Sequence, residues 1–313
     1  MIISPMNPTN AIDGAVRLTH LGVIRAQGDE ALKFLHGQLT NDMLGLAPTR
    51  ARLAGFCSAK GRLQASFMVW TGAADEVLMA CSASLLPATL KRLSMFVLRS
   101  RCKLSDASTK WPLFGIVGDA AGRLAGDAAA WTRLDREGGS FIVLPDAAGL
   151  RRGLWAGGAA PASPPIDPDA WRWLEVRSGL PTIQAETVDR FVPQMLNYEL
   201  LGGVDFQKGC YPGQEIVARS QYRGTIKRRM FLFDVAAPAA PGDEVFHSAD
   251  PGQPAGMVVN AAPRPGTSAS SVLVEVKLAA IDAGSLHLGS VEGPVLHGEA
   301  LPYAVPLEPA AAG

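Results

Sequence analysis

The sequence predicts an α+β fold that ends in a small β-barrel, and three observations carry this prediction. The chain has 313 residues, of which 48% are hydrophobic and 19% charged, so it can bury the cores of two or three domains. Residues 45–108 show the patterns of three strands, a helix and a strand, which indicates a small α+β unit. After residue 224, short strands alternate with proline and glycine turns, a pattern typical of a small barrel.

Hydrophobic periodicity predicts the elements of the first half of the chain. A strand is expected over residues 21–26, followed by a helix that Asp29 caps and whose apolar residues recur at helical spacing. The next elements are expected to be strands at residues 52–56, 62–70 and 77–81, a helix at 85–96, and strands at 99–104, 112–117 and 141–144. Residues 118–130 are rich in Ala, Gly and Asp and show no clear period.

The second half begins with a linker. Residues 156–168 have the composition of a loop, and a helix is expected at residues 168–178, with Gly179 as its terminator. Trp171 and Leu174 fall on one side of this helix, which we expect to be buried. The barrel strands are expected at residues 226–235, 256–259, 272–278, 286–288 and 295–296.

The charges are balanced overall but unevenly placed. The formal net charge is zero, which argues against a general nucleic-acid or membrane-surface binder. Residues 43–105, however, hold nine Lys and Arg side chains against one Asp and one Glu. A basic segment in a neutral chain indicates an anionic ligand or partner, although a solvated basic surface is the more common cause.

The four cysteines form no recognisable motif. No two of them have the spacing of zinc ligands or of a redox pair, so no metal site is expected. The N-terminus lacks a charged segment followed by an apolar run, and no stretch is as long and apolar as a membrane span. We therefore expect a soluble, reduced protein of the cytoplasm that has no membrane partner.

Residues 208–219 (KGCYPGQEIVAR) join a cysteine to the signals for the start of a helix. Pro212 suits the first position of a helix, and Gly224 suits its end. Cys210 would then lie just outside a helix N-terminus with Lys208 two residues away, and both neighbours favour the thiolate. The alternative is a buried, inert thiol.

Three stretches resemble one known family. Residues 208–215 resemble the K-G-C-[YF]-x-G-Q-E signature of the folate-binding YgfZ family, with Pro212 where a threonine is expected. Residues 34–42 (FLHGQLTND) resemble the F-L-x-G-Q-L-T-N-D stretch that opens the YgfZ and aminomethyltransferase families. Residues 179–181 and 193–197 resemble the family's G-[IL]-P turn and its P-Q-x-x-N stretch. Together with the closing barrel, the resemblance covers nearly the whole chain.

The resemblance implies a GcvT-like folate-binding fold, which is shared with the aminomethyltransferase of the glycine cleavage system. In this fold a ferredoxin-like α+β subdomain and a small C-terminal β-barrel accompany a central folate-binding domain. We therefore expect the central domain at residues 1–44 plus 112–224, the basic α+β subdomain at 45–111 and the barrel at 225–313.

The resemblance also implies a function. Such a protein binds tetrahydrofolate, including its polyglutamylated form, and acts in the maturation or repair of [4Fe–4S] proteins such as tRNA methylthiotransferases. Cys210 would be the working thiolate and Lys208 would lower its pKa. The expected partners are folate and iron–sulfur client or assembly proteins, with no direct nucleic-acid partner. The residues expected to bind the cofactor are Gln38, Asn41, Asp42, Gln194, Asn197, Tyr211, Gln214, Glu215, Arg219 and Arg223.

Some of these assignments have ordinary structural alternatives. Gln194 and Asn197 can meet the donor and acceptor edge of a pterin, or they can cap a turn. Arg219, Arg223 and Lys227 can pair with the glutamate carboxylates of folate. Arg223 and Lys227 can equally belong to a solvated surface.

The chain departs from the transferase in two ways. The transferase carries a carboxylate soon after its first glycine-rich turn, but residues 43–74 of this chain contain no Asp or Glu, and the transferase lacks the cysteine of residues 208–215. Both differences point away from glycine cleavage and leave open whether the chain is an enzyme. The alternatives are a folate-dependent aminomethyl or methyl transferase or demethylase, a non-catalytic folate-binding scaffold, and a thiol redox protein. The last would need Cys57, Cys81 or Cys102 beside Cys210.

Overall fold

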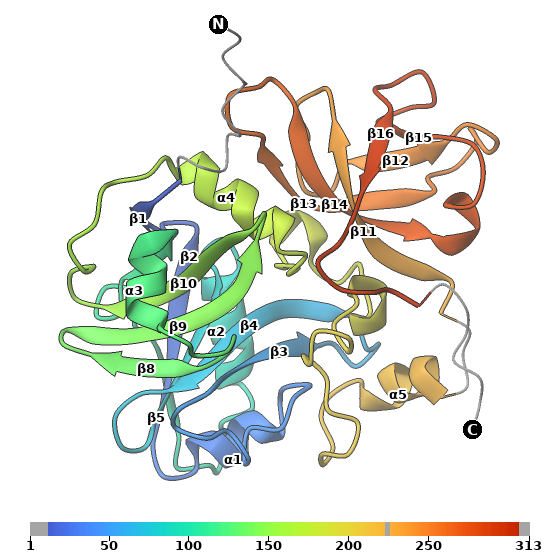
Figure 1. Cartoon of the computed structure of the whole chain (residues 1–313). Helices are drawn as coiled ribbons and strands as arrows, with labels where there is room; N and C mark the ends of the chain where they lie inside the picture. The colour runs from blue at the N-terminus through green and yellow to red at the C-terminus, as the bar shows by residue number, and fades with distance from the viewer. Residues whose placement is uncertain (1–11, 223–225, 307–313) are drawn as a thin grey trace, which may run out of the picture.

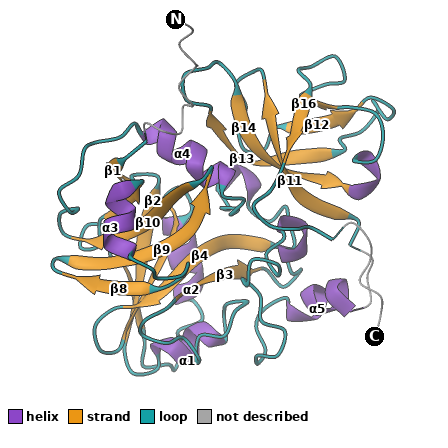
Figure 2. Ribbon diagram, in the orientation of Figure 1, coloured by secondary structure: helices purple, strands orange, loops and turns teal. Residues whose placement is uncertain are grey.

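Three antiparallel β-sheets form the framework of the chain in the computed structural model, which describes residues 12–222 and 226–306. In Figure 1 the C-terminal sheet stands at the upper right, and the other two sheets lie to its lower left. Figure 2 shows that strands dominate and that the helices between them are short. The predicted α+β class is confirmed. Within the described residues, no helix combines the length and the apolar character needed to cross a membrane.

The first sheet contains most of the basic segment. Its order is β3-β4-β5-β2-β6, with the bounds Ala51–Cys57, Leu63–Thr71, Glu76–Ser82, Leu21–Gln27 and Lys103–Asp106. Helix α1 (Ala31–His36) follows β2, and helix α2 (Leu86–Ser94) follows β5. Because β2 pairs with β5 and β6, it shares a sheet with strands from residues 51–106. The division of the chain into domains stays a prediction.

The second sheet has the order β1-β7-β10-β9-β8, with the bounds Gly14–Arg17, Leu113–Val117, Leu150–Gly157, Gly139–Ala147 and Arg133–Arg136. Helix α3 (Asp119–Ala125) packs on this sheet through three buried alanines, Ala120, Ala121 and Ala125. Small side chains let the helix lie close to the strands beneath it.

The third sheet is the predicted C-terminal barrel. Its order is β15-β12-β13-β14-β11-β16, with the bounds Leu286–Leu288, Glu244–His247, Gly256–Pro263, Ser270–Lys277, Arg228–Val235 and Leu296–Glu299. The two outer strands of this order approach each other, and an antiparallel bridge joins His287 to Val295. The sheet is therefore a nearly closed, six-stranded barrel.

Helix α4 (Pro168–Arg177) links the sheets. It begins where the Asp167 side chain accepts from the Asp169 backbone N–H, and it ends before Gly179, as predicted. It packs on β13 and β14, where Trp173 Nε1 donates to Ser271 Oγ at 3.0 Å. Trp171 and Leu174 are buried, as expected, in a hydrophobic cluster that draws residues from all three sheets.

The structure corrects several sequence predictions. Asp29 does not cap α1: Glu30 stands at that position, and the Asp29 carboxylate accepts from Arg101 Nε. The strand expected at 99–104 lies at Lys103–Asp106. Five α-helices and β-strands were not predicted at all, namely β1, α3, β8, β10 and β12. The helix end expected at Gly224 lies outside the described residues.

Candidate functional site

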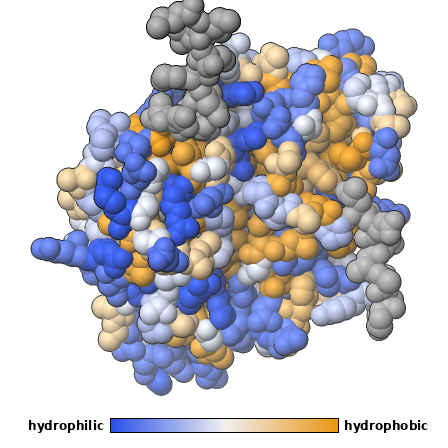
Figure 3. All heavy atoms as spheres, viewed as in Figure 1, coloured by the Kyte–Doolittle hydropathy of each residue, from blue (hydrophilic) through white to orange (hydrophobic). Residues whose placement is uncertain are grey.

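Cys210 lies in the loop that precedes helix α5 (Gln214–Tyr222), at the lower right of Figure 1. All four cysteines are in the described part of the chain, and Cys210 alone is exposed. The helix begins at Gln214, so Pro212 belongs to the turn before it and not to its first position. Figure 3 shows apolar side chains gathered above α5, around the segment that joins α4 to α5. The exposed thiol therefore stands close to a surface that is partly apolar.

The other three cysteines are poorly placed for thiol chemistry. Burial raises the pKa of the Cys57 thiol to about 12, assisted by the Asp189 charge, and burial together with Asp106 does the same for Cys81. Burial also raises the pKa of the half-buried Cys102 to about 11. These thiols stay protonated near neutral pH, which weakens the case for a resolving cysteine.

Lys208 fastens the Cys210 loop to helix α1. Its Nζ donates to the carbonyl oxygen of His36, the last residue of the helix, and at 2.9 Å to that of Leu39 just beyond it, so the cation lies at the C-terminal end of the helix. The same Nζ lies 4.8 Å from the centroid of the Tyr211 ring. Burial lowers the pKa of Lys208 to about 8, while the charges of Asp205, Asp42 and Cys210 act in the opposite direction.

Gly213 fastens the other end of the loop to the turn between β3 and β4. Its φ angle is +79°, which disfavours every residue with a side chain. A Cβ atom built at Gly213 would lie 2.3 Å from Ser58 O and 2.7 Å from Gly61 Cα. The backbone at Gly213 therefore packs directly against the backbone of the turn, and this close packing requires a glycine at this position of the motif.

Two of the predicted residues near α1, Asn41 and Asp42, contact other residues of the protein through hydrogen bonds and ion pairs. Asn41 Nδ2 donates to Leu53 O and Gly202 O, both at 2.7 Å. The Asp42 carboxylate lies 3.0 Å from His36 Nδ1 and 3.3 Å from Arg52 Nη1. Gln38 Oε1 is buried and has no hydrogen-bond partner among the described residues.

Gln194 and Asn197 join the barrel to the rest of the chain. The 3₁₀ helix η3 (Pro193–Leu196) ends at Asn197, whose φ angle is +58°. Gln194 Nε2 donates to Val217 O of α5, and Asn197 Nδ2 donates to Met230 O of β11, each at 2.8 Å. The amide donors are occupied by backbone carbonyls of distant segments, whereas Gln194 Oε1 and Asn197 Oδ1 are buried and have no hydrogen-bond partner among the described residues. The role of these two residues in ligand binding stays a prediction.

The remaining predicted residues surround α5. Glu215 and Arg219 form an exposed ion pair of 3.0 Å, four residues apart on the helix surface. Tyr211 is buried, Gln214 is half-buried and Lys227 is exposed. Arg223 lies outside the described residues. None of the predicted residues that the structure describes lines the two cavities considered next.

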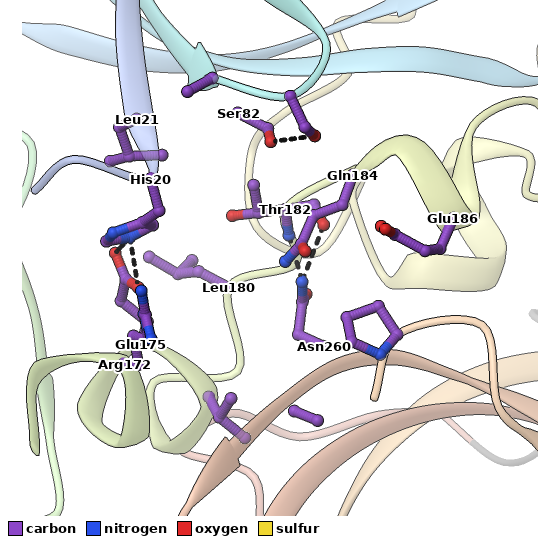
Figure 4. Close-up of a pocket in the computed structure, with 15 residues that line it drawn as sticks. His20, Leu21, Ser82, Arg172, Glu175, Leu180, Thr182, Gln184, Glu186 and Asn260 are labelled. Carbon is purple, nitrogen blue, oxygen red and sulfur yellow. Dashed lines mark hydrogen bonds and ion pairs between the residues drawn. The ribbon is translucent and has the colours of Figure 1, made fainter. Parts of the chain in front are cut away.

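Two adjoining cavities lie beside β2 and α4, and the larger one also reaches the barrel. The larger has a volume of about 340 Å³ and the smaller a volume of about 50 Å³. They share four lining residues: Leu21, Glu175, Leu180 and Thr182. In Figure 4, His20 and Glu175 form one wall of the larger cavity, and Thr182 and Asn260 form another. Such a cavity suits a small organic ligand.

The polar groups of the larger cavity come from three distant parts of the chain. His20 Nε2 lies 2.9 Å from Glu175 Oε2, which joins the start of β2 to α4. Asn260 of β13 accepts from Thr182 N at 2.9 Å and donates to Thr182 O at 2.8 Å. Sequence reasoning missed these residues. One signal was available, because Glu175 follows Trp171 by four residues and so shares the buried face of α4.

The smaller cavity holds a buried cation, Arg152 of β10. Its side chain is almost fully buried, and its Nε donates to Pro145 O at 2.8 Å. Burial lowers the pKa of Arg152 to about 10, and the charges of Glu175 and Asp146 oppose that shift. No sequence signal marked Arg152, because the strand that carries it was itself not predicted.

Lys208 is expected to make stability depend on pH in alkaline solution. Its pKa of about 8 in the folded chain lies below the ordinary lysine value of 10.5, so between these values only the unfolded chain retains the proton. The contribution of Lys208 to the free energy of unfolding is therefore present above pH 10.5 and is lost as the pH falls through 8. Urea unfolding should show that the free energy of unfolding of wild type rises between about pH 7.5 and about pH 9.5. The same rise should be smaller in Lys208→Met. An equal rise in both proteins would contradict the assignment.

Comparisons with known proteins find several that are similar to this chain in sequence. No family model matches it. A protein of Edwardsiella ictaluri named tRNA-modifying protein YgfZ is 32% identical over 245 residues, which cover 70% of this chain and 70% of that protein. A Vibrio vulnificus protein of the same name is 30% identical and is covered to 71%, with 72% of this chain aligned. An uncharacterized Haemophilus influenzae protein is also 30% identical, over 70% of this chain and 73% of its own length.

One solved structure shows the same fold. It is the aminomethyltransferase T of the glycine cleavage system from Bartonella henselae, with a TM-score of 0.71. The match covers 93% of this chain and 86% of that chain at 14% sequence identity. At that identity the match speaks for the fold alone, and it confirms the predicted GcvT-like architecture.

Proposed function

The chain belongs to the YgfZ family of tRNA-modifying proteins, and on that premise we propose that it binds tetrahydrofolate and acts in the maturation or repair of [4Fe–4S] proteins. Its clients would be enzymes such as tRNA methylthiotransferases, and Cys210 would be its working thiolate. The observation that carries the proposal is the position of Cys210, which is exposed in a loop held at both ends.

The anchoring of the loop supports a role for this thiol. Lys208 holds one end against the carbonyls of α1, and Gly213 packs the other end against the turn after β3. A thiol held in this way is presented to a partner in one place and needs no ordering when the partner arrives. Thiolates are the usual ligands of iron–sulfur clusters, but one cysteine cannot hold a cluster alone. The client would therefore supply the other ligands.

The cavities beside Glu175 fit the folate part of the proposal. The larger one, at about 340 Å³, has the size of a small-ligand site, and the smaller one extends it inward. The Glu175 carboxylate faces both and can accept from the N–H groups of a pterin ring. Arg172, about half exposed on the wall of the larger cavity, can meet the glutamate carboxylates. The predicted residues Gln38, Asn41, Asp42, Gln194 and Asn197 would then support the site from outside it.

The transferase alternative meets an obstacle at β4. Among the described residues, this strand presents Ser66, Phe67 and Met68 to the smaller cavity and supplies no carboxylate, although one-carbon transfer would call for one there. The carboxylate that does line this cavity, Glu175, comes from α4. Ser66 Oγ accepts from Ile183 N at 2.9 Å, so it serves a structural contact. Folate binding without glycine cleavage is the better-supported proposal.

A rescue assay tests the proposal. In cells that lack this protein, the activity of a [4Fe–4S] tRNA methylthiotransferase is measured after wild type, Cys210→Ala or Cys102→Ala is restored. We expect wild type and Cys102→Ala to restore it and Cys210→Ala to fail. Rescue by Cys210→Ala would make the protein a scaffold that does not use its thiol, and failure of wild type would remove the iron–sulfur assignment.

A further inference from the structure

Arg152 is a buried cation whose hydrogen bonding is incomplete. Its exposed fraction is 1%, and its guanidinium lies 5.6 Å from the centroid of the Trp171 ring. Nε is satisfied by Pro145 O at 2.8 Å. Nη2 is also buried but has no hydrogen-bond partner within residues 12–222 and 226–306. A buried donor without an acceptor is costly, and a charged one more so, so a missing acceptor is implied.

The position of Arg152 indicates where that acceptor comes from. The side chain lines the 50 Å³ cavity, and Glu175 lines the same cavity. Glu175 also lines the 340 Å³ cavity, so a flat ligand that enters the larger space can place one edge between the cation and the carboxylate. The inner end of the site thus offers a hydrogen-bond donor beside an acceptor. A matching ligand edge must offer an acceptor beside a donor.

We propose that Arg152 selects the 4-oxo edge of the ligand by donating from Nη2 to the 4-oxo oxygen of a pterin, while Glu175 accepts from the neighbouring N3–H. This inference rests on the proposed folate site and adds its selectivity. A 4-oxo pteridine presents an acceptor at the point where Arg152 donates. A 2,4-diaminopteridine presents an amino donor at the same point, and two donors then face each other without an acceptor between them. The site should reject such analogues, because a buried donor left unpaired discriminates strongly.

Folic acid and aminopterin differ only in the group on C4, although the 4-amino group also leaves N3 without its proton, so they form a matched pair of ligands. The full-length protein is titrated with each, and the dissociation constants are measured by calorimetry. Wild type should bind folic acid at least about tenfold more tightly than aminopterin. Arg152→Met should lower this ratio, mainly by weakening folic acid, while the contact of Glu175 with N3–H keeps part of the preference. Arg151→Met removes the same charge from the next residue of β10, whose Nη2 donates to Gly126 O at 3.2 Å, and should keep the wild-type ratio.

Each outcome has a distinct meaning. Equal binding of the two ligands by wild type, or an unchanged ratio in Arg152→Met, overturns the role of Arg152 and leaves folate binding intact. Binding of neither ligand by wild type overturns the folate site together with this inference. If Arg152→Met does not fold, as judged by circular dichroism, Arg152→Lys decides the question. Lysine keeps a charged donor, so the preference for folic acid should persist, and its loss would count against donation to the 4-oxo group.

Discussion

Replacement of Gly213 by alanine is expected to displace the Cys210 loop and to lower the free energy of unfolding by about 3 kcal/mol. Two costs combine at this position. Alanine disfavours the φ angle of +79°, and its methyl group would lie 2.3 Å from Ser58 O and 2.7 Å from Gly61 Cα. Neither contact can be relieved by rotating a side chain, so the start of α5 must move away from the β3–β4 turn. Urea unfolding measures the loss of stability, and rescue of the methylthiotransferase should fail as well.

The second glycine of the motif provides the control. A methyl group at Gly209 would meet His36 Nε2 at 3.4 Å, which is an ordinary contact with the end of a side chain. Gly209→Ala should therefore change the unfolding free energy by no more than about 0.5 kcal/mol. The two glycines look alike in the motif, and only their environments in the fold distinguish them. If Gly213→Ala were as stable as Gly209→Ala, the contact with the turn would not be what holds the loop.

Strands could be predicted where polar and apolar residues alternate or where β-branched and aromatic residues are frequent. Helices and strands built largely from small residues could not be predicted. β4 and β5 were found within two residues of their observed ends because their apolar runs are bounded by turn residues. Helix α3 was missed because glycine and alanine dominate it, and its stability comes from packing small buried faces on the second sheet. β10 was missed because Gly153 to Gly157 is buried throughout, so no polar face alternates with the apolar one.

The candidate site likewise has one part that could be predicted from the sequence and one part that could not. The Cys210 loop is contiguous in sequence, so its motif could be recognised and the start of its helix placed to within two residues. The cavity walls come from His20, Glu175 and Asn260, which are brought together only when β2, α4 and the barrel pack. No local pattern encodes a meeting of this kind. The motif that holds Gln194 and Asn197 could be recognised, but the sequence did not reveal that their amide nitrogens donate to the backbone carbonyls of Val217 and Met230.

Glu175→Gln is expected to weaken folate binding by about 30-fold, which corresponds to about 2 kcal/mol. The carboxylate is the acceptor that the proposed site offers to the N–H groups of the pterin, and hydrogen bonds to a charged group are the strong ones. Glutamine has the same size and can still accept from His20, which lies 2.9 Å from Glu175 Oε2, so the walls of the cavity should persist. Calorimetric titration with folic acid measures the change, and thermal unfolding checks that the variant is intact.

Glu186→Gln is the matched control, because it removes the same charge from another wall of the same cavity. Glu186 lies in the 3₁₀ helix η2 (Ala185–Thr187) and lines the larger cavity but not the smaller one. If the pterin reaches inward to Glu175, this control should bind folic acid within about twofold of wild type. If both variants weaken binding equally, the carboxylates act only through the overall charge of the cavity, and the ring does not contact Glu175. If Glu175→Gln binds as tightly as wild type, the ligand lies elsewhere, and the residues around Cys210 become the next site to test.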